Sequence, residues 1–130
     1  MRASSGRSNA PYETSPGYDP QAYVEAIARH YGINLRGSGQ RISVLYDHDL
    51  APAGLTKGDD NGLIIRVGPG ALRGGDADVA NTIAHELSHA RYYLRNGTFA
   101  GEPHGDGDSL ADGTPYGSGN ALADWINGRR

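Results

Sequence analysis

Apolar residues recur along this sequence at spacings that predict alternating helices and strands. The first helix is predicted over residues 20–31, because Tyr23, Ile27 and Tyr31 follow one another at intervals of four, about one helical turn. Asp19 stands directly before this segment, where a capping side chain is common, and a proline occupies the first helical position. The sequence therefore marks both the beginning and the buried face of this helix.

Two β-rich segments follow the first helix. Residues 41–46 and 63–67 contain alternating or continuous apolar side chains, many of them β-branched, and both are predicted to be strands. The chain between them, residues 47–60, is rich in turn-forming residues and is predicted to be a loop. Glycines at positions 68, 70, 74 and 75 are expected to break the chain after the second strand.

The clearest pattern in the sequence predicts a second helix that ends at Asn96 and Gly97. Asp76 or Asp78 is expected to cap its beginning. Its apolar stripe has spacings of four, four, three and four residues and consists of Val79, Ile83, Leu87, Ala90 and Leu94. A glycine-rich loop and a short helix over residues 120–127 complete the chain, so the predicted fold class is α+β.

Composition limits the size and the setting of this fold. A chain of 130 residues with 20 glycines and 7 prolines is expected to form one domain with many loops. We expect residues 1–17 to be a linker or a cloning remnant and residues 18–130 to be the domain. No apolar segment is long enough for a membrane span or a signal peptide, so a soluble protein is expected.

Charge and cysteine content exclude several classes of function. The chain has 12 Lys and Arg against 15 Asp and Glu, a net charge of −3, and its basic residues are scattered. A nucleic-acid partner is therefore not expected, because no basic stripe could follow a phosphate backbone. The absence of cysteine excludes disulfides, thiolate catalysis and cysteine-ligated metal sites.

Three residues of the second predicted helix form an H-E-x-x-H pattern. His85 and His89 are four residues apart, so their imidazoles lie one turn apart on one helical face and can bind the same zinc ion. Both are expected at the margin of the apolar stripe, where they can face a cleft. Glu86 beside them can act as general base on a zinc-bound water that then attacks a carbonyl. The pattern thus predicts a zinc site suited to amide hydrolysis.

The segment A-H-E-L-S-H-A at residues 84–90 resembles the active-site helix of zincin metallopeptidases. The order of a helix, two strands and the H-E-x-x-H helix is also similar to the small zincin core. The resemblance implies a zinc-dependent peptidase or amide hydrolase that acts on a peptide or protein. In that family the strand before the active helix forms the edge of the cleft, and residues 63–67 are the matching segment, so substrate is expected to add to this strand.

Zincins have a third protein ligand, and several residues remain candidates for it here. An acidic ligand from a later helix, as in the gluzincins, would be Asp124, and the imidazole of His104 is the alternative. Further acidic candidates in the glycine-rich loop are Asp106, Asp108 and Asp112. Tyr116, in a turn flanked by glycine, is a candidate donor to a developing oxyanion, as tyrosine is in several zincins.

A compact domain behind a linker also resembles the C-terminal effectors of bacterial polymorphic toxins. This resemblance implies delivery into a target cell by a larger carrier, and a cognate immunity protein as partner. Two other classes stay open. One is a zinc-dependent nuclease or deaminase, which the acidic charge and the missing cysteines oppose. The other is a non-catalytic binding module with a structural metal, which would not need Glu86.

Overall fold

Four helices and five short strands make up the part of the chain described by this computed structural model, residues 19–59, 62–103 and 115–127. The helices are α2 (Pro20–His30), α3 (Pro69–Arg73), α4 (Asp76–Asn96) and α5 (Pro115–Ile126). The strands are β1 (Arg36–Gly37), β2 (Gln40–Arg41), β3 (Ser43–Tyr46), β4 (Gly54–Asp59) and β5 (Gly62–Val67). The predicted α+β class is confirmed. Among these helices none has both the length and the apolarity that a membrane span requires.

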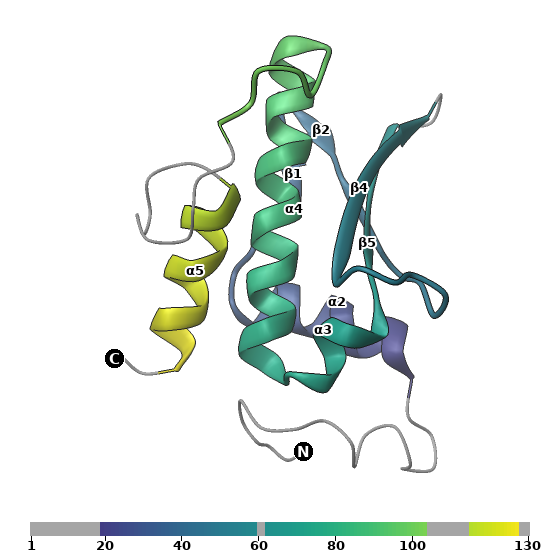
Figure 1. Ribbon diagram of the computed structural model, residues 1–130, viewed down its shortest axis with the longest axis vertical. Helices are drawn as coiled ribbons and strands as arrows, with labels where there is room; N and C mark the ends of the chain where they lie inside the picture. The colour runs from purple at the N-terminus through teal and green to yellow at the C-terminus, as the bar shows by residue number, and fades with distance from the viewer. Residues whose placement is uncertain (1–18, 60–61, 104–114, 128–130) are drawn as a thin grey trace.

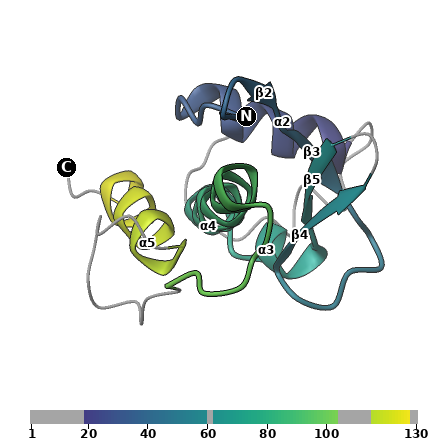
Figure 2. The same cartoon turned by 90° about the horizontal axis from the view of Figure 1, so that it is seen from above.

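Helix α4 is the centre of the molecule. It runs between α5 on one side and the sheet of β3, β4 and β5 on the other, while α2 packs beside β3 (Figures 1 and 2). The stripe predicted for α4 is confirmed, since Val79, Ile83, Leu87 and Ala90 are buried, and the fifth member, Leu94, is partly buried and packs against the core. They join one apolar core with buried side chains from α2, α3, β3 and β5. The central helix is therefore held on both sides, which fixes the residues it carries.

The three-stranded sheet has the order β3-β5-β4. Strand β5 lies in the middle, parallel to β3 and antiparallel to β4. The prediction that residues 63–67 form the edge of a cleft is therefore wrong, because both edges of β5 are already paired within the sheet. The edge strand on the side of α4 is β4, in which Thr56 stands opposite Ile65.

Strand β4 lies inside residues 47–60, which were predicted to be a loop. Strand propensity predicts a loop here, because it is low for four of the six residues: Gly54, Lys57, Gly58 and Asp59. At an edge, however, glycines and charged residues are tolerated, and the hydrogen-bond ladder to β5 decides the conformation. The glycines at 68 and 70 were predicted to break the chain after the second strand. In the structure this segment contains the beginning of α3, with Pro69 as its first residue.

The predicted ends of α2 and α4 are confirmed in part. Asp19 caps α2, because its Oδ1 accepts from the backbone nitrogens of Gln21 at 3.1 Å and Ala22 at 3.3 Å. Helix α4 begins after Gly75, which has no capping side chain, so the capping role predicted for Asp76 or Asp78 is wrong. Both carboxylates lie in its first turn, where the positive end of the helix dipole favours them. The predicted stop at Gly97 is confirmed by its left-handed φ of 73°.

Helix α5 begins at Pro115, five residues before the predicted start at 120. Gly119, which the sequence predicts to lie in the loop before this helix, allows the helix to approach α4 closely. A Cβ on Gly119 would lie 2.1 Å from Oδ1 and 2.7 Å from the carbonyl oxygen of Asn81 in α4. The Asn81 side chain also donates to Oδ1 of Asn120 at 3.0 Å. Tertiary packing has thus overridden the low helix propensity of glycine.

The two edges of the sheet differ in their surroundings. At β3, the Gln21 side chain of α2 accepts from the Tyr46 nitrogen at 2.6 Å and donates to the Val44 carbonyl at 3.0 Å. One amide side chain therefore occupies hydrogen-bonding groups that another strand would need. The outer edge of β4 has no strand beside it among the described residues.

Candidate metal centre

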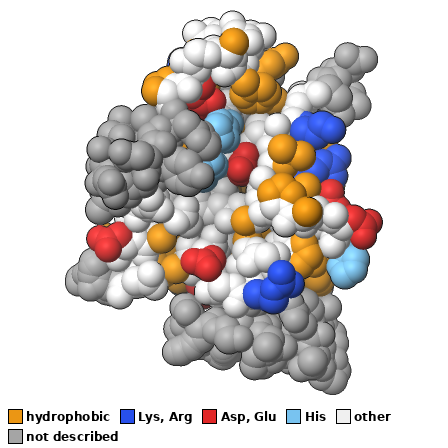
Figure 3. Space-filling model, in the orientation of Figure 1, with side chains coloured by type: hydrophobic (Ala, Val, Ile, Leu, Met, Phe, Trp, Pro, Cys, Tyr) orange, Lys and Arg blue, Asp and Glu red, His pale blue; other side chains and the backbone are white. Residues whose placement is uncertain are grey.

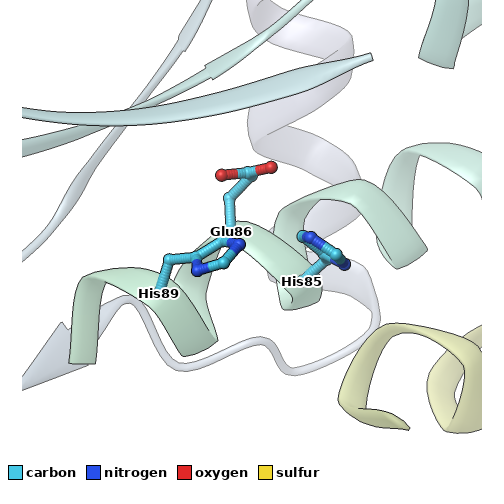
Figure 4. Close-up of side chains that lie close together, drawn as sticks. All are labelled: His85, Glu86 and His89. Atoms are coloured by element: carbon cyan, nitrogen blue, oxygen red, sulfur yellow. The ribbon is translucent and has the colours of Figure 1, made fainter. Parts of the chain in front are cut away.

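Three side chains of α4 gather where the helix faces β4. The possible ligand atoms of His85, Glu86 and His89 all lie within 4.8 Å of one another, and the described residues contain no other such group of three. The two imidazole rings are 5.0 Å apart between centroids and inclined at 69°. The two rings lie side by side along the helix, and the Glu86 carboxylate rises toward the strand above (Figure 4). The predicted convergence of these three residues is thus present.

The helical period explains why these side chains occupy different environments. Leu87 and Ala90 point into the core, which leaves His85 and His89 half-buried at the margin of the stripe, as predicted. Glu86 is turned toward the sheet and is only 8 % exposed. Histidine and acidic side chains meet at the surface beside the sheet (Figure 3).

Strand β4 holds the Glu86 carboxylate. Thr56 Oγ1 lies 2.7 Å from Glu86 Oε1 and 3.0 Å from the Glu86 carbonyl oxygen. A hydroxyl has one hydrogen, so it donates to one of these acceptors at a time. Gly54 makes room for the same side chain, because a Cβ there would lie 2.9 Å from Glu86 Cγ. The edge strand therefore packs directly against the candidate general base.

Glu102 is a site residue that the sequence did not reveal. Its Oε1 lies 2.7 Å from Nδ1 of His89, and its side chain is 7 % exposed. Glu102 follows the end of α4 in a loop that folds back along the helix. Glu102 is too far from the H-E-x-x-H pattern along the chain for a helical or strand spacing to connect them. The only sequence signal is that the chain has just four glutamates, of which Glu102 is one.

A cavity adjoins each histidine. The cavity beside His89 has a volume of about 310 Å³ and is lined by Leu55, Thr56, His89, Phe99 and Glu102. Leu55 and Phe99 are 37 % and 38 % exposed, so this cavity has an apolar rim. The cavity beside His85, of about 370 Å³, is more polar and includes Asp78, Asn81 and Thr82. Desolvation raises the pKa of the Asp78 carboxyl. The two ends of the site thus differ in chemistry.

The candidates for a third ligand and an oxyanion donor lie elsewhere or outside the described residues. Asp124 is exposed on α5 and is not part of the group formed by the two histidines and Glu86. Tyr116 is in the first turn of α5, but its side chain lies outside the described part of the chain. The loop candidates, all in residues 104–114, also lie outside it: His104, Asp106, Asp108 and Asp112.

The donor set suits a divalent transition metal. Imidazole nitrogen and carboxylate oxygen both ligate zinc, and two histidines one turn apart present their rings to a common point. No family model, no curated protein and no solved structure matches this chain. The geometry of α4 and β4 therefore carries the functional conclusion.

Proposed function

We propose that this protein is a zinc-dependent peptidase or amide hydrolase. His85 and His89 are the proposed ligands and Glu86 the proposed general base. The observation that carries the proposal is the setting of Glu86, which is buried beside both imidazoles and hydrogen-bonded to the edge strand of the sheet. A metal site that only stabilised the fold would need the histidines but not a carboxylate held in this way.

Each residue of the site has a separate role in the proposed reaction. When bound, zinc supplies an acidified water and polarises the carbonyl of the substrate. Glu86 takes a proton from the attacking water on its carboxylate and passes it to the departing amine. Thr56 keeps that carboxylate beside β4, the strand along which a substrate chain would lie. The proposed third ligand is Asp124, with His104 or an acidic residue of the glycine-rich loop as the alternative.

The sheet indicates how substrate binds. An extended peptide can add to β4 through main-chain hydrogen bonds, because β4 is the edge strand next to Glu86. The opposite edge is occupied by Gln21. The cavity at Leu55 and Phe99 would then receive an apolar side chain of the peptide next to His89. We therefore propose peptides or proteins with a large apolar residue near the cleaved bond as substrates.

We also propose that the domain serves as the toxic effector of a bacterial polymorphic toxin. The support for this role is the resemblance noted in the sequence. A larger carrier would deliver the domain into the target cell, and an immunity protein would protect the producing cell. A protein that covered the open edge of β4 would block substrate addition, which gives such an inhibitor a direct mode of action.

The decisive experiment compares wild type with Glu86→Gln and His85→Ala. Zinc content is measured first, and cleavage of a peptide library is then followed by mass spectrometry. We expect wild type and Glu86→Gln to hold zinc, only wild type to cleave, and His85→Ala to do neither. Glu25→Gln makes the same substitution on the exposed face of α2 and should behave as wild type. Zinc binding without cleavage by wild type would instead favour a binding module.

A further inference from the structure

We propose that Glu102 is a positioning residue that selects the nitrogen through which His89 binds metal. Its carboxylate accepts the Nδ1 hydrogen of His89 and leaves Nε2 as the ligating atom. The inference rests on the proposed function, since it assigns a role within the same metal site. Glu102 itself stays out of the coordination shell.

The contact is short and shielded from water. Glu102 Oε1 and His89 Nδ1 are 2.7 Å apart, and the two side chains are 7 % and 19 % exposed. A buried carboxylate accepts hydrogen bonds only, so the imidazole nitrogen facing it must carry the hydrogen. A neutral imidazole has one N–H, and its other nitrogen, Nε2, therefore keeps the lone pair that a metal needs.

The loop that carries Glu102 is fixed to α4 at several points. Gly97 turns the chain in the left-handed conformation, and the Tyr92 hydroxyl then donates to the Ala100 carbonyl at 2.9 Å. The Phe99 ring lies 4.7 Å from that of Tyr93 and 6.4 Å from that of His89, between centroids. These contacts hold the loop against the helix, so Glu102 meets His89 without a large ordering cost when metal binds.

The geometry favours positioning of His89 by Glu102 over direct ligation of a metal by Glu102. Glu102 is not among the residues whose donor atoms lie within 4.8 Å of one another, although it touches one of them. Its Oε1 contacts Nδ1, so Nε2 is the nitrogen of that ring with a lone pair for a metal. Carboxylates that orient ligating histidines in this manner typically raise metal affinity by about 10- to 100-fold.

The first test needs no metal. Nitrogen chemical shifts of the His89 ring, measured by NMR in metal-free protein above neutral pH, report which nitrogen carries hydrogen. We expect the Nδ1–H form in wild type and in Glu25→Gln, and a shift toward the Nε2–H form in Glu102→Ala. A dominant Nε2–H form in wild type would overturn the proposal, whether or not the protein binds zinc.

The second test measures the affinity for Zn²⁺ by competition with a chelating dye. We expect Glu102→Ala to bind zinc about 10- to 100-fold more weakly than wild type, and Glu102→Gln to lose less because its amide oxygen can still accept. Unchanged affinity in Glu102→Ala would contradict the proposal. Weaker zinc binding by Glu102→Ala could also arise if Glu102 were itself a ligand, and X-ray absorption distinguishes the two explanations. The same number of zinc ligands in both proteins supports positioning, and one ligand fewer in the variant would make Glu102 a ligand. If wild type bound no zinc, the proposed function would fail while the first test still decided the role of Glu102.

Discussion

Glu86 shows how a buried charge is stabilised at this site. Removing a carboxylate from water is costly unless hydrogen bonds or a nearby positive charge compensate. Thr56 provides one such bond at 2.7 Å, and a metal held by His85 and His89 would provide the charge. Burial of the Glu86 carboxylate lowers the stability of the folded state. The same burial keeps bulk water from competing for hydrogen bonds to the carboxylate. Its position therefore supports the proposed role as general base rather than a role in stability.

Thr56→Val should separate the orientation of Glu86 from its presence. Valine keeps the shape of the side chain but removes the hydroxyl, and a hydrogen bond to a charged group contributes about 1.5–3 kcal/mol. We expect kcat to fall by about 10- to 100-fold with little change in KM or in zinc content. Steady-state kinetics on a cleaved peptide measure this effect.

Ser43→Ala is the matched control for that variant, because it deletes an exposed hydroxyl from β3, on the far side of the sheet. It should leave kcat unchanged. An equal loss of kcat in both variants, or no loss in Thr56→Val, would show that the contact between Thr56 and Glu86 does not serve catalysis.

The sequence predicts the site residues only where they are close along the chain. His85, Glu86 and His89 were found because a helix converts a spacing of four into a shared face. Thr56 is 30 residues from Glu86, and Glu102 reaches His89 through a loop that folds back. Such contacts depend on strand pairing and loop packing, which leave no periodic signal in the sequence.

Among the elements, α4 was predictable and β4 was not, for one physical reason. Helix α4 buries a long apolar stripe, so its pattern repeats several times within the element itself. Strand β4 has one partner strand among the described residues and owes its conformation to β5. Glycine is typical of loops, yet Gly54 in β4 and Gly119 in α5 stand where these elements closely approach α4.

Gly119→Ala tests the close approach of α5 to α4. On helix propensity alone, alanine should stabilise α5 by up to about 1 kcal/mol. The added Cβ would, however, lie 2.7 Å from a backbone oxygen of Asn81, which cannot rotate away. We expect a net destabilisation of about 1–3 kcal/mol, the usual effect of overpacking, measured by urea unfolding.

Gly70→Ala is the control for this substitution. A Cβ on Gly70, in α3, would have only the flexible Arg73 side chain nearby, at 3.8 Å. There we expect alanine to be neutral or to stabilise the protein by a few tenths of a kcal/mol. If Gly119→Ala stabilised the protein as Gly70→Ala does, α4 and α5 would have room between them that this packing does not provide.

The stability of the whole molecule should depend on the proposed metal. Zinc bound only by the folded state adds RT ln(1 + [Zn]/Kd) to stability, about 2.7 kcal/mol when free zinc is about 100 times Kd. For a domain of this size that corresponds to roughly 10 °C in Tm. We expect a chelator to lower the Tm of wild type by this amount and to leave His89→Ala unchanged. Equal melting curves of wild type with and without chelator would mean that α4 holds no metal.

The asymmetric sheet connects the site to the proposed biological role. One edge is occupied by Gln21, while the other passes over Glu86, so the proposed hydrolysis and the proposed strand addition would occur at one place. A domain that cleaves proteins there should harm a cell that produces it. We expect wild type, expressed in the bacterial cytoplasm or periplasm, to inhibit growth, and Glu86→Gln to be harmless at equal abundance.

Comparison of host protein termini between the two cultures identifies the chemistry behind that effect. New termini that require Glu86, preceded or followed by large apolar residues, would support peptidase activity and the role of the cavity at Leu55 and Phe99. Inhibition without new termini would indicate a different hydrolytic target for the same metal centre. If wild type is as harmless as Glu86→Gln in both compartments, the effector role is wrong, because a delivered toxin must act once it is inside its target.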